Sequence, residues 1–305
     1  MRPLADLHRV DWASLRHAYG DASDVPDLLR ALATDGHAAA LDALYGTIFH
    51  QGSRYEAAAY AVPFLLGLAA DPGTPARADL VLLLSALAVG YDETCLPDGV
   101  DLEGWRSRVA AMVATDPAQA YRELDEWVAA APAEREWQRT LFDPAESRRA
   151  AAAELAAYEA VLAGAPVIVE LLDDPSPEVR VAALSLLGFL PAYEAAPCVR
   201  TLLAGAEPDG VIATAVVTLG LLGVSPATVR PYLAHTSAAV RWAAAIALAR
   251  LGDTSPAVVE ALAGFVVEPP PRTDPAVPFY GGDLRGYAAV SLAELRDRVP
   301  GPAGL

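Results

Sequence analysis

The sequence predicts an all-α fold, a right-handed α-α superhelix in which helical hairpins stack into a solenoid. Composition gives the first indication, because 54% of the residues are hydrophobic while only 7% are aromatic, and alanine and leucine dominate. These side chains lose little conformational entropy in a helix. The runs of Val, Ile, Thr and Tyr that are typical of a sheet are largely missing. A recurring proline gives the second indication.

Each recurring proline opens an amphipathic stretch of two to three helical turns, and it suits the first turn because its missing N–H needs no partner there. These prolines are Pro26, Pro63, Pro166, Pro197, Pro226 and Pro256. Their spacings are 37, 103, 31, 29 and 30 residues. The value of 103 is close to three units of about 34 residues, which is the period of a helical hairpin.

A longer helix is expected after each proline-led helix and its turn. The clearest pattern has apolar residues at helical spacing through Val179, Ala182, Ala183, Leu186 and Leu187. The same register returns in residues 211–220, 240–248 and 284–292. One such hairpin cannot bury its apolar face alone, so neighbouring hairpins must stack.

The whole chain, 1–305, is therefore expected to form a single solenoid with four successive parts. These are an N-terminal cap (1–23), the first repeats (24–90), irregular helical repeats (91–164) and regular repeats (165–299) with a loop insertion at 268–282. Residues 296–305 would be a frayed end.

Three segments interrupt the period: residues 50–55, 91–99 and 268–282. The first two each connect a second helix to the next first helix, so a solenoid places them on the same edge. The prolines of the third forbid regular structure, and we expect it to project as an extended loop. Insertions of this kind often carry binding residues.

The proline-led helix, the turn at Asp173 and Asp174, and the Val179-Arg180 start of the next helix resemble HEAT repeats. The resemblance is to the short HEAT-like variety of phycobilisome-lyase-type proteins, and it is specific over 165–295 and looser over 24–90. It implies that the second helices line the concave side. Those lyases attach or isomerise tetrapyrroles on a partner protein, but no residue here matches a chromophore site.

Charge and composition exclude several classes of function. The chain has no Lys and no Asn, which is typical of a very GC-rich genome such as that of an actinobacterium, and it rules out a Schiff-base lysine and a phosphate-binding GxxxxGK loop. A net charge of -17 disfavours nucleic acid and anionic membranes and favours a basic protein or peptide partner. No signal-peptide core or membrane-length apolar run occurs, so we expect a cytoplasmic protein.

Metal and nucleophile motifs are also missing. None of the five histidines has a His or acidic partner at the i+4 spacing on one helical face, and no GxSxG motif occurs. Cys95 follows Asp92 and Glu93, whose charges would raise the thiol pKa, and Cys198 is expected in the core. We therefore predict no metal, no cofactor and no catalytic residue.

On the concave face, the candidate binding residues are Trp242, Ile246 and Arg241. Trp242 either anchors a partner or is buried, and the sequence leaves both readings open. Arg180, Arg241 and Arg285 share one position of the repeat. They could form a ladder that grips carboxylates, but pairing with a turn aspartate such as Asp173 or Asp174 is the better interpretation.

At the rim, the first two interruptions would bring together His50, Arg54, Tyr55, Tyr91 and Glu93, either as a polar pocket or as helix-end residues. The third interruption adds Phe279 and Tyr280 as candidates.

The leading hypothesis is a non-enzymatic scaffold that binds a protein or peptide on its concave face. The alternative is a lyase-like or isomerase-like enzyme, or a chaperone, that acts on a small molecule in the rim pocket. A third hypothesis is a structural role through self-association. The sequence does not determine the oligomeric state.

Overall fold

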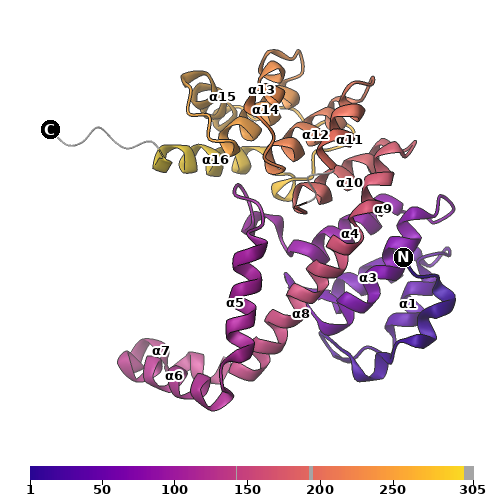
Figure 1. The fold of residues 1–305 in the computed structure, drawn as a ribbon, viewed down its shortest axis with the longest axis vertical. Coiled ribbons are helices and arrows are strands. Elements are labelled where there is room, and N and C mark those ends of the chain that lie inside the picture. Colours follow the sequence, from indigo (N-terminus) through magenta and orange to yellow (C-terminus); the bar gives the residue numbers. More distant parts are fainter. Residues whose placement is uncertain (142, 192–194, 299–305) are drawn as a thin grey trace.

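The computed structural model describes residues 1–141, 143–191 and 195–298, and helices make up most of them (Figure 1). The predicted all-α repeat fold is confirmed. The strands found in these residues form two short antiparallel hairpins, in which β1 (Arg16–His17) pairs with β2 (Gly20–Asp21) and β3 (Phe49–His50) with β4 (Ser53–Arg54).

Helices follow one another along the chain, with short 3₁₀ turns (η) between some of them. In order they are η1 (Leu4–Arg9), η2 (Trp12–Ser14), α1 (Val25–Ala31), α2 (His37–Thr47), α3 (Glu56–Ala70), α4 (Arg77–Val89), η3 (Asp92–Thr94), α5 (Leu102–Ala114), α6 (Pro117–Ala130), α7 (Pro132–Leu141), α8 (Pro144–Ala163), α9 (Ala165–Glu170), η4 (Leu171–Asp173), α10 (Pro177–Gly188), α11 (Ala195–Leu203), α12 (Asp209–Leu221), α13 (Pro226–Val229), η5 (Arg230–Ala234), α14 (Ala238–Arg250), α15 (Pro256–Val267), η6 (Tyr280–Gly282) and α16 (Leu284–Arg298). The predicted frayed end at 296–305 lies outside the described residues from 299 onward.

The second helices of the hairpins form one row, the inner row, in the order α4, α10, α12, α14 and α16, and each packs against the next. Close contact within the row depends on small residues. A Cβ on Gly220 would lie 2.6 Å from the Cα of Ala247, so α12 and α14 can approach closely only with glycine there. The buried Thr218 hydroxyl donates to the carbonyl of Leu184, 2.8 Å away, and links α12 to α10.

Proline lies in the first turn of α1, α9, α11, α13 and α15, as the sequence predicts. Pro63 is the exception, because it lies inside α3, which begins at Glu56 directly after β4. The turn before Pro63 is helical because its residues Ala57, Ala58 and Ala61 are fully buried in the core. Tertiary packing thus overrides the local cost of an interior proline, about 3 kcal/mol.

The N-terminal cap covers the end of the solenoid beside α3. The Arg2 amide donates to the Pro63 carbonyl, 2.9 Å away. The buried Trp12 ring lies 6.2 Å from Phe64, and its indole N–H donates to the Leu7 carbonyl. These contacts hide the apolar face of the first layer from water, which is what a terminal cap must do.

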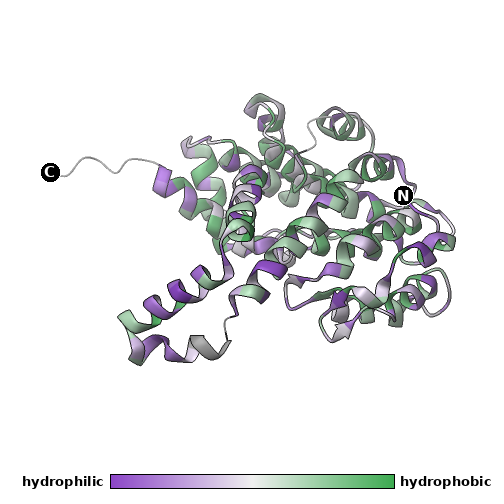
Figure 2. Cartoon of the chain, turned by 60° about the horizontal axis from the view of Figure 1, so that its bottom comes forward, coloured by the Kyte–Doolittle hydropathy of each residue, from purple (hydrophilic) through white to green (hydrophobic). Residues whose placement is uncertain are grey.

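Residues 102–163 leave the inner row between two of its layers: α5, α6, α7 and the start of α8 form an arm, and α8 returns to pack against α3 and α4. Because α4 packs directly on α10, the segment between them leaves the row and returns to it. α5 and α8 lie side by side, and α6 and α7 pack at the far end (Figure 1). In Figure 2 the arm projects from the body of the molecule.

Ion pairs between layers differ from the expected arginine and turn-aspartate pairing. The Asp174 carboxylate pairs with Arg77 of the preceding layer, with Nη1 and Oδ2 2.6 Å apart, and both side chains are largely buried. Arg180 instead donates to the backbone carbonyl of Asp174 and binds Glu207 ahead of α12, at 2.6 and 2.7 Å. Arg180 does connect one unit to the next, as predicted, but through Glu207. The predicted pairing with the Asp174 carboxylate is wrong, because Arg77 binds that carboxylate.

Candidate functional site

Residues 268–282, which we call the strap, do not project from the molecule. They lie across the inner row, so the expectation of a projecting loop was wrong. Within the strap, Pro275, Val277 and Phe279 are buried, whereas the residues between them are partly exposed. This alternation is that of an extended chain with one face on a core. The prolines exclude helix and ladder pairing, but they do not prevent this packing.

Phe279 anchors the strap. Its ring is fully buried, 5.9 Å from the ring of Phe189 on α10 and 6.4 Å from that of Tyr287 on α16. Tyr280 stacks on Tyr287 at 5.8 Å. The predicted binding role of Phe279 is therefore replaced by a packing role, whereas Tyr280 keeps a partly exposed surface.

Trp242 and Ile246 are also core residues, with 0% and 1% of their surface exposed, which corrects their selection as binding residues. The Trp242 indole N–H donates to the Leu284 carbonyl at 2.9 Å, and its ring packs edge-on against Tyr287 at 5.8 Å. Of the two readings that the sequence left open, burial is correct. Arg241 donates to the carbonyls of His235 and Thr236 and so closes the turn before α14.

Two close contacts hold the strap, one at its middle and one near its C-terminal end. A Cβ on Gly210, at the start of α12, would lie 1.8 Å from the Pro275 carbonyl oxygen, so the strap passes where only glycine fits. Near the C-terminal end of the strap, the Asp92 carboxylate accepts hydrogen bonds from the amides of Tyr280 and Gly281 at 2.7 and 3.2 Å. We call the second contact the Asp92 latch.

The pKa of Asp92 is raised to about 6, mainly by burial and also by the neighbouring Glu93 carboxylate, while hydrogen bonds from the Tyr280 and Gly281 amides oppose the shift. The dominant effect is loss of hydration of the charged form. Glu93 itself lies against the strap, since a Cβ on Gly281 would be 2.8 Å from its Oε1. The structure therefore places the Glu93 carboxylate against the strap at Gly281, next to the predicted site residue Tyr280.

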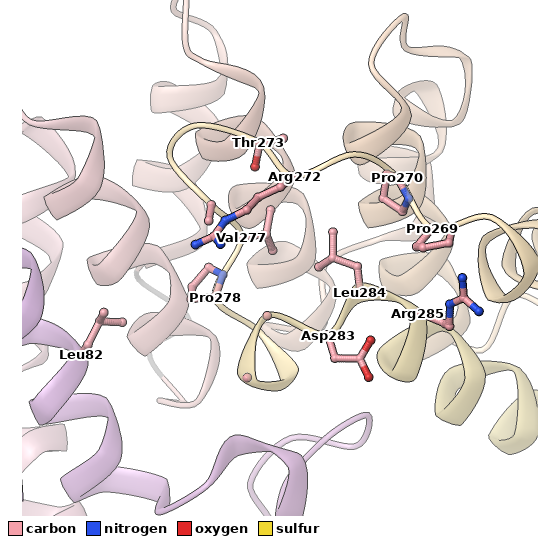
Figure 3. Close-up of a pocket in the computed structure, with 13 residues that line it drawn as sticks. Leu82, Pro269, Pro270, Arg272, Thr273, Val277, Pro278, Asp283, Leu284 and Arg285 are labelled. Atoms are coloured by element: carbon pink, nitrogen blue, oxygen red, sulfur yellow. The ribbon is translucent and has the colours of Figure 1, made fainter.

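A cavity of about 700 Å³ lies between the strap, the start of α16 and α4. We call it the strap pocket. Its lining residues are Leu82, Pro269, Pro270, Arg272, Thr273, Ala276, Val277, Pro278, Gly281, Gly282, Asp283, Leu284 and Arg285. The size is that of a typical ligand site in a protein. Figure 3 shows Arg272 and Arg285 on opposite sides, with Val277 and Leu284 between them and Pro278 beside Arg272.

The strap pocket is locally cationic in an acidic protein. Arg272 and Arg285 are both exposed, and within the described part of the chain neither makes an ion pair or a hydrogen bond. Asp283 is the acidic residue of the lining, and its carboxylate accepts the Gly286 amide at 2.9 Å, in the first turn of α16. The positive end of the α16 helix dipole partly offsets the negative charge of Asp283. The pocket therefore favours a carboxylate.

At the rim, the structure brings His50, Arg54, Tyr55 and Tyr91 together, as the topology predicts. The β3–β4 hairpin turns through Gln51 and Gly52, both at positive φ, and the Tyr91 ring covers Gly52 so closely that a Cβ there would lie 3.0 Å from Cδ2. Position 52 needs glycine because its φ is positive and because a Cβ would press against the Tyr91 ring. The rings of Tyr19 and His50 meet edge-on at 5.4 Å.

Arg54 lies beneath this surface as a structural residue. Its Nη1 donates to the Gly52 carbonyl at 2.8 Å and lies 3.4 Å from Glu154 of α8, and its guanidinium lies 5.9 Å from the Trp105 ring centroid. Burial lowers the pKa of Arg54, and Glu154 opposes that effect. Burial is likewise the main cause that raises the pKa of Tyr55. The group joins the first repeats to the arm.

His50, Arg54, Tyr55 and Tyr91 line none of the cavities described here for residues 1–141, 143–191 and 195–298. The pKa of the Cys95 thiol is raised, as predicted, but burial is the main cause and Asp92 adds little. Cys198 is exposed on α11 and is not in the core as expected. The rim geometry thus favours the helix-end reading of these residues.

The described segments contain no candidate metal site. There, no group of three or more His, Cys, Asp or Glu side chains is placed to hold a metal ion. No single helix in the same segments has both the length and the apolar character to cross a bilayer, and only α8 and the following α9–η4 segment, taken together across a 51° bend, reach that length and composition.

Comparison with known families identifies one segment. The family model described as HEAT repeat matches residues 165–190, which contain α9, η4 and α10. A search of curated proteins gave no match. The matched hairpin carries the Arg180 and Asp174 contacts described above, and its second helix belongs to the inner row. The chain therefore contains a HEAT repeat at the position where the proline-led hairpin is clearest.

Proposed function

We propose that this chain is a protein-interaction scaffold that binds an extended peptide segment of a partner protein in the strap pocket. The observation that carries the proposal is the chemistry of that pocket: apolar walls with an unpaired arginine on each side. HEAT repeats generally present an inner face to other proteins, and the matched repeat lies in the same row of helices. We propose that the peptide binds on the predicted concave side, with the strap as the floor of the binding surface.

Rigid apolar walls suit an extended peptide. Three of the lining residues are prolines, and Val277 and Leu284 add aliphatic surface. Proline and packed aliphatic side chains lose little entropy on binding, which favours affinity for a chain that lies along them. Alternate side chains of such a peptide would face the floor.

Arg272 and Arg285 select a peptide that carries carboxylates. A guanidinium forms strong, directional hydrogen bonds with a carboxylate. Their wide separation in Figure 3 matches acidic side chains at two places along a peptide better than one small anion. The whole-chain charge of -17 slows the approach of such a peptide, but its field is screened beyond about 10 Å at moderate salt. The basic partner expected from net charge belongs to another surface.

The test is selection from a random peptide library on the immobilised protein, followed by affinity measurements with the enriched peptides. Enriched peptides should combine apolar residues with Asp or Glu. Arg272→Ala combined with Arg285→Ala should weaken them by at least about tenfold, or 1.4 kcal/mol. Arg30→Ala, an exposed arginine on α1, is the matched control. Enrichment of peptides that bind the double variant equally well would refute the proposal, as would no enrichment at all.

A further inference from the structure

A second surface lies at the far end of the arm, which we call the arm tip: the end of α5, α6, α7 and the start of α8. α6 and α7 pack against each other, and α6 also packs against α8 (Figures 1 and 2). Val128 is the one side chain of α6 that is buried. The arm tip therefore covers little of its own apolar surface.

Large hydrophobic side chains are exposed at the arm tip. Half of the ten exposed large hydrophobics among the described residues lie there: Met112, Val113, Tyr121, Trp127 and Trp137. Trp127 and Trp137 are 41% and 57% exposed. Burying a side chain of this size gains about 1.5–3 kcal/mol, so exposing several together indicates a surface that another molecule covers. Tryptophan is also the residue type most enriched among binding hot spots.

A groove of about 380 Å³ runs between these helices. It is lined by Met112, Thr115, Ala120, Glu123, Leu124, Trp127, Pro144, Ser147 and Arg148. Met112, Leu124 and Trp127 form an apolar wall contributed by two helices. The Arg135 guanidinium stacks 4.4 Å from the centre of the Trp127 ring and holds its side chain in place. Such a groove accepts apolar anchors from one face of an amphipathic helix.

The charge around the groove selects the occupant. Residues 116–149 contain eight carboxylates and five arginines, so this stretch is still net acidic. Of these arginines, Arg148 lines the groove and donates to the Val113 carbonyl. Glu123 lies in the groove wall, and Glu126 is exposed on the same helix. A second copy of this chain would bring an equally acidic surface to the interface, and an anionic membrane would be repelled in the same way. A helix with basic residues beside its apolar anchors is complementary.

We infer that the arm tip docks a basic amphipathic helix of a partner protein. Trp127 and Leu124 receive its apolar residues, and Glu123 and neighbouring carboxylates face its lysines or arginines. The surface is separate from the strap pocket and has the opposite charge. One scaffold would therefore hold two segments of unlike chemistry.

The test uses a synthetic helical peptide with leucines along one face and lysines on the other, and a matched peptide with glutamate in place of lysine. The lysine peptide should bind the full chain at least about tenfold more tightly than the glutamate peptide, with affinity falling as salt rises. Trp127→Ala should weaken the lysine peptide at least about tenfold. Tyr60→Ser, which alters an exposed aromatic on α3, should change its affinity less than about twofold.

Charge reversal keeps the test decisive if Trp127→Ala disturbs the fold of the arm tip. Glu123→Lys should weaken the lysine peptide and strengthen the glutamate peptide. Arg272→Ala with Arg285→Ala should leave both unchanged, which separates this surface from the strap pocket. The inference is overturned if both peptides bind alike, or if neither binds. It is also overturned if the protein binds vesicles of zwitterionic lipid through Trp127 and ignores the lysine peptide.

Discussion

Replacing Phe279 by alanine tests whether the strap is part of the core. The phenyl ring is fully buried between Phe189 and Tyr287. Truncating a buried Phe to Ala costs about 3–5 kcal/mol, and that range includes aromatic contacts worth roughly 0.5–1.5 kcal/mol each. Each kcal/mol lowers Tm by about 2–3 °C in a chain of this size. We therefore expect Phe279→Ala to lower Tm by roughly 6–15 °C.

Two measurements separate a cavity in the core from release of the strap. Thermal or urea unfolding gives the loss of stability, and trypsin cleavage after Arg272 reports detachment of the strap backbone. If the strap detaches, the loss of stability is limited to its docking free energy and cleavage accelerates. Val267→Ala is the control, since Val267 is 78% exposed and its change should stay within about 0.5 kcal/mol. An unchanged Tm together with an unchanged cleavage rate for Phe279→Ala would refute the packing role.

Three further perturbations test the contacts between layers and along the strap. Arg77→Ala leaves the buried Asp174 carboxylate without its ion-pair partner and should cost about 3 kcal/mol in urea unfolding; a loss below about 1 kcal/mol would contradict this. Gly210→Ala places a methyl group against the strap and should destabilise by about 1–3 kcal/mol, whereas Gly264→Ala, on an open helix face, should be neutral or stabilising; equal effects would refute the close approach. Because folding raises the pKa of Asp92 to about 6, the folded chain binds that proton more tightly, so stability should fall as pH rises from about 4 to about 6. Asp92→Asn should reduce this slope and be more stable than wild type at pH 7.5, by at most about 3 kcal/mol, and an unaltered slope would show that another group titrates.

The helical hairpins were predictable because their signals are local. The signals for α9 and α10 are a proline in the first turn and apolar residues at helical spacing, and each signal lies within the helix that it specifies. Pro63 shows the limit of such signals, since burial of the alanines before it extends α3 by more than a turn.

The site was not predictable in the same way, because the residue that covers a helix can be far away in sequence. Helical period marks Trp242 as apolar, but its burial depends on Leu284 and Tyr287 of α16, more than 40 residues further along the chain. The alternating burial of Pro275, Val277 and Phe279 is visible only in the structure, because Ala276 and Pro278 between them are nonpolar as well. The sequence gives the net charge of the chain, but it does not show that Arg272 and Arg285 line the same pocket.

The Asp92 latch and the ion pair between Asp98 and Arg298 join residues that are 188 to 200 positions apart. An open array of repeats can gain or lose units from an end, because each unit touches only its neighbours. Here the last helix and a loop from the first third of the chain hold each other in place. Shortening the chain from its C-terminus would therefore disturb the early layers, and folding must wait for a distant loop closure that local hairpins do not need.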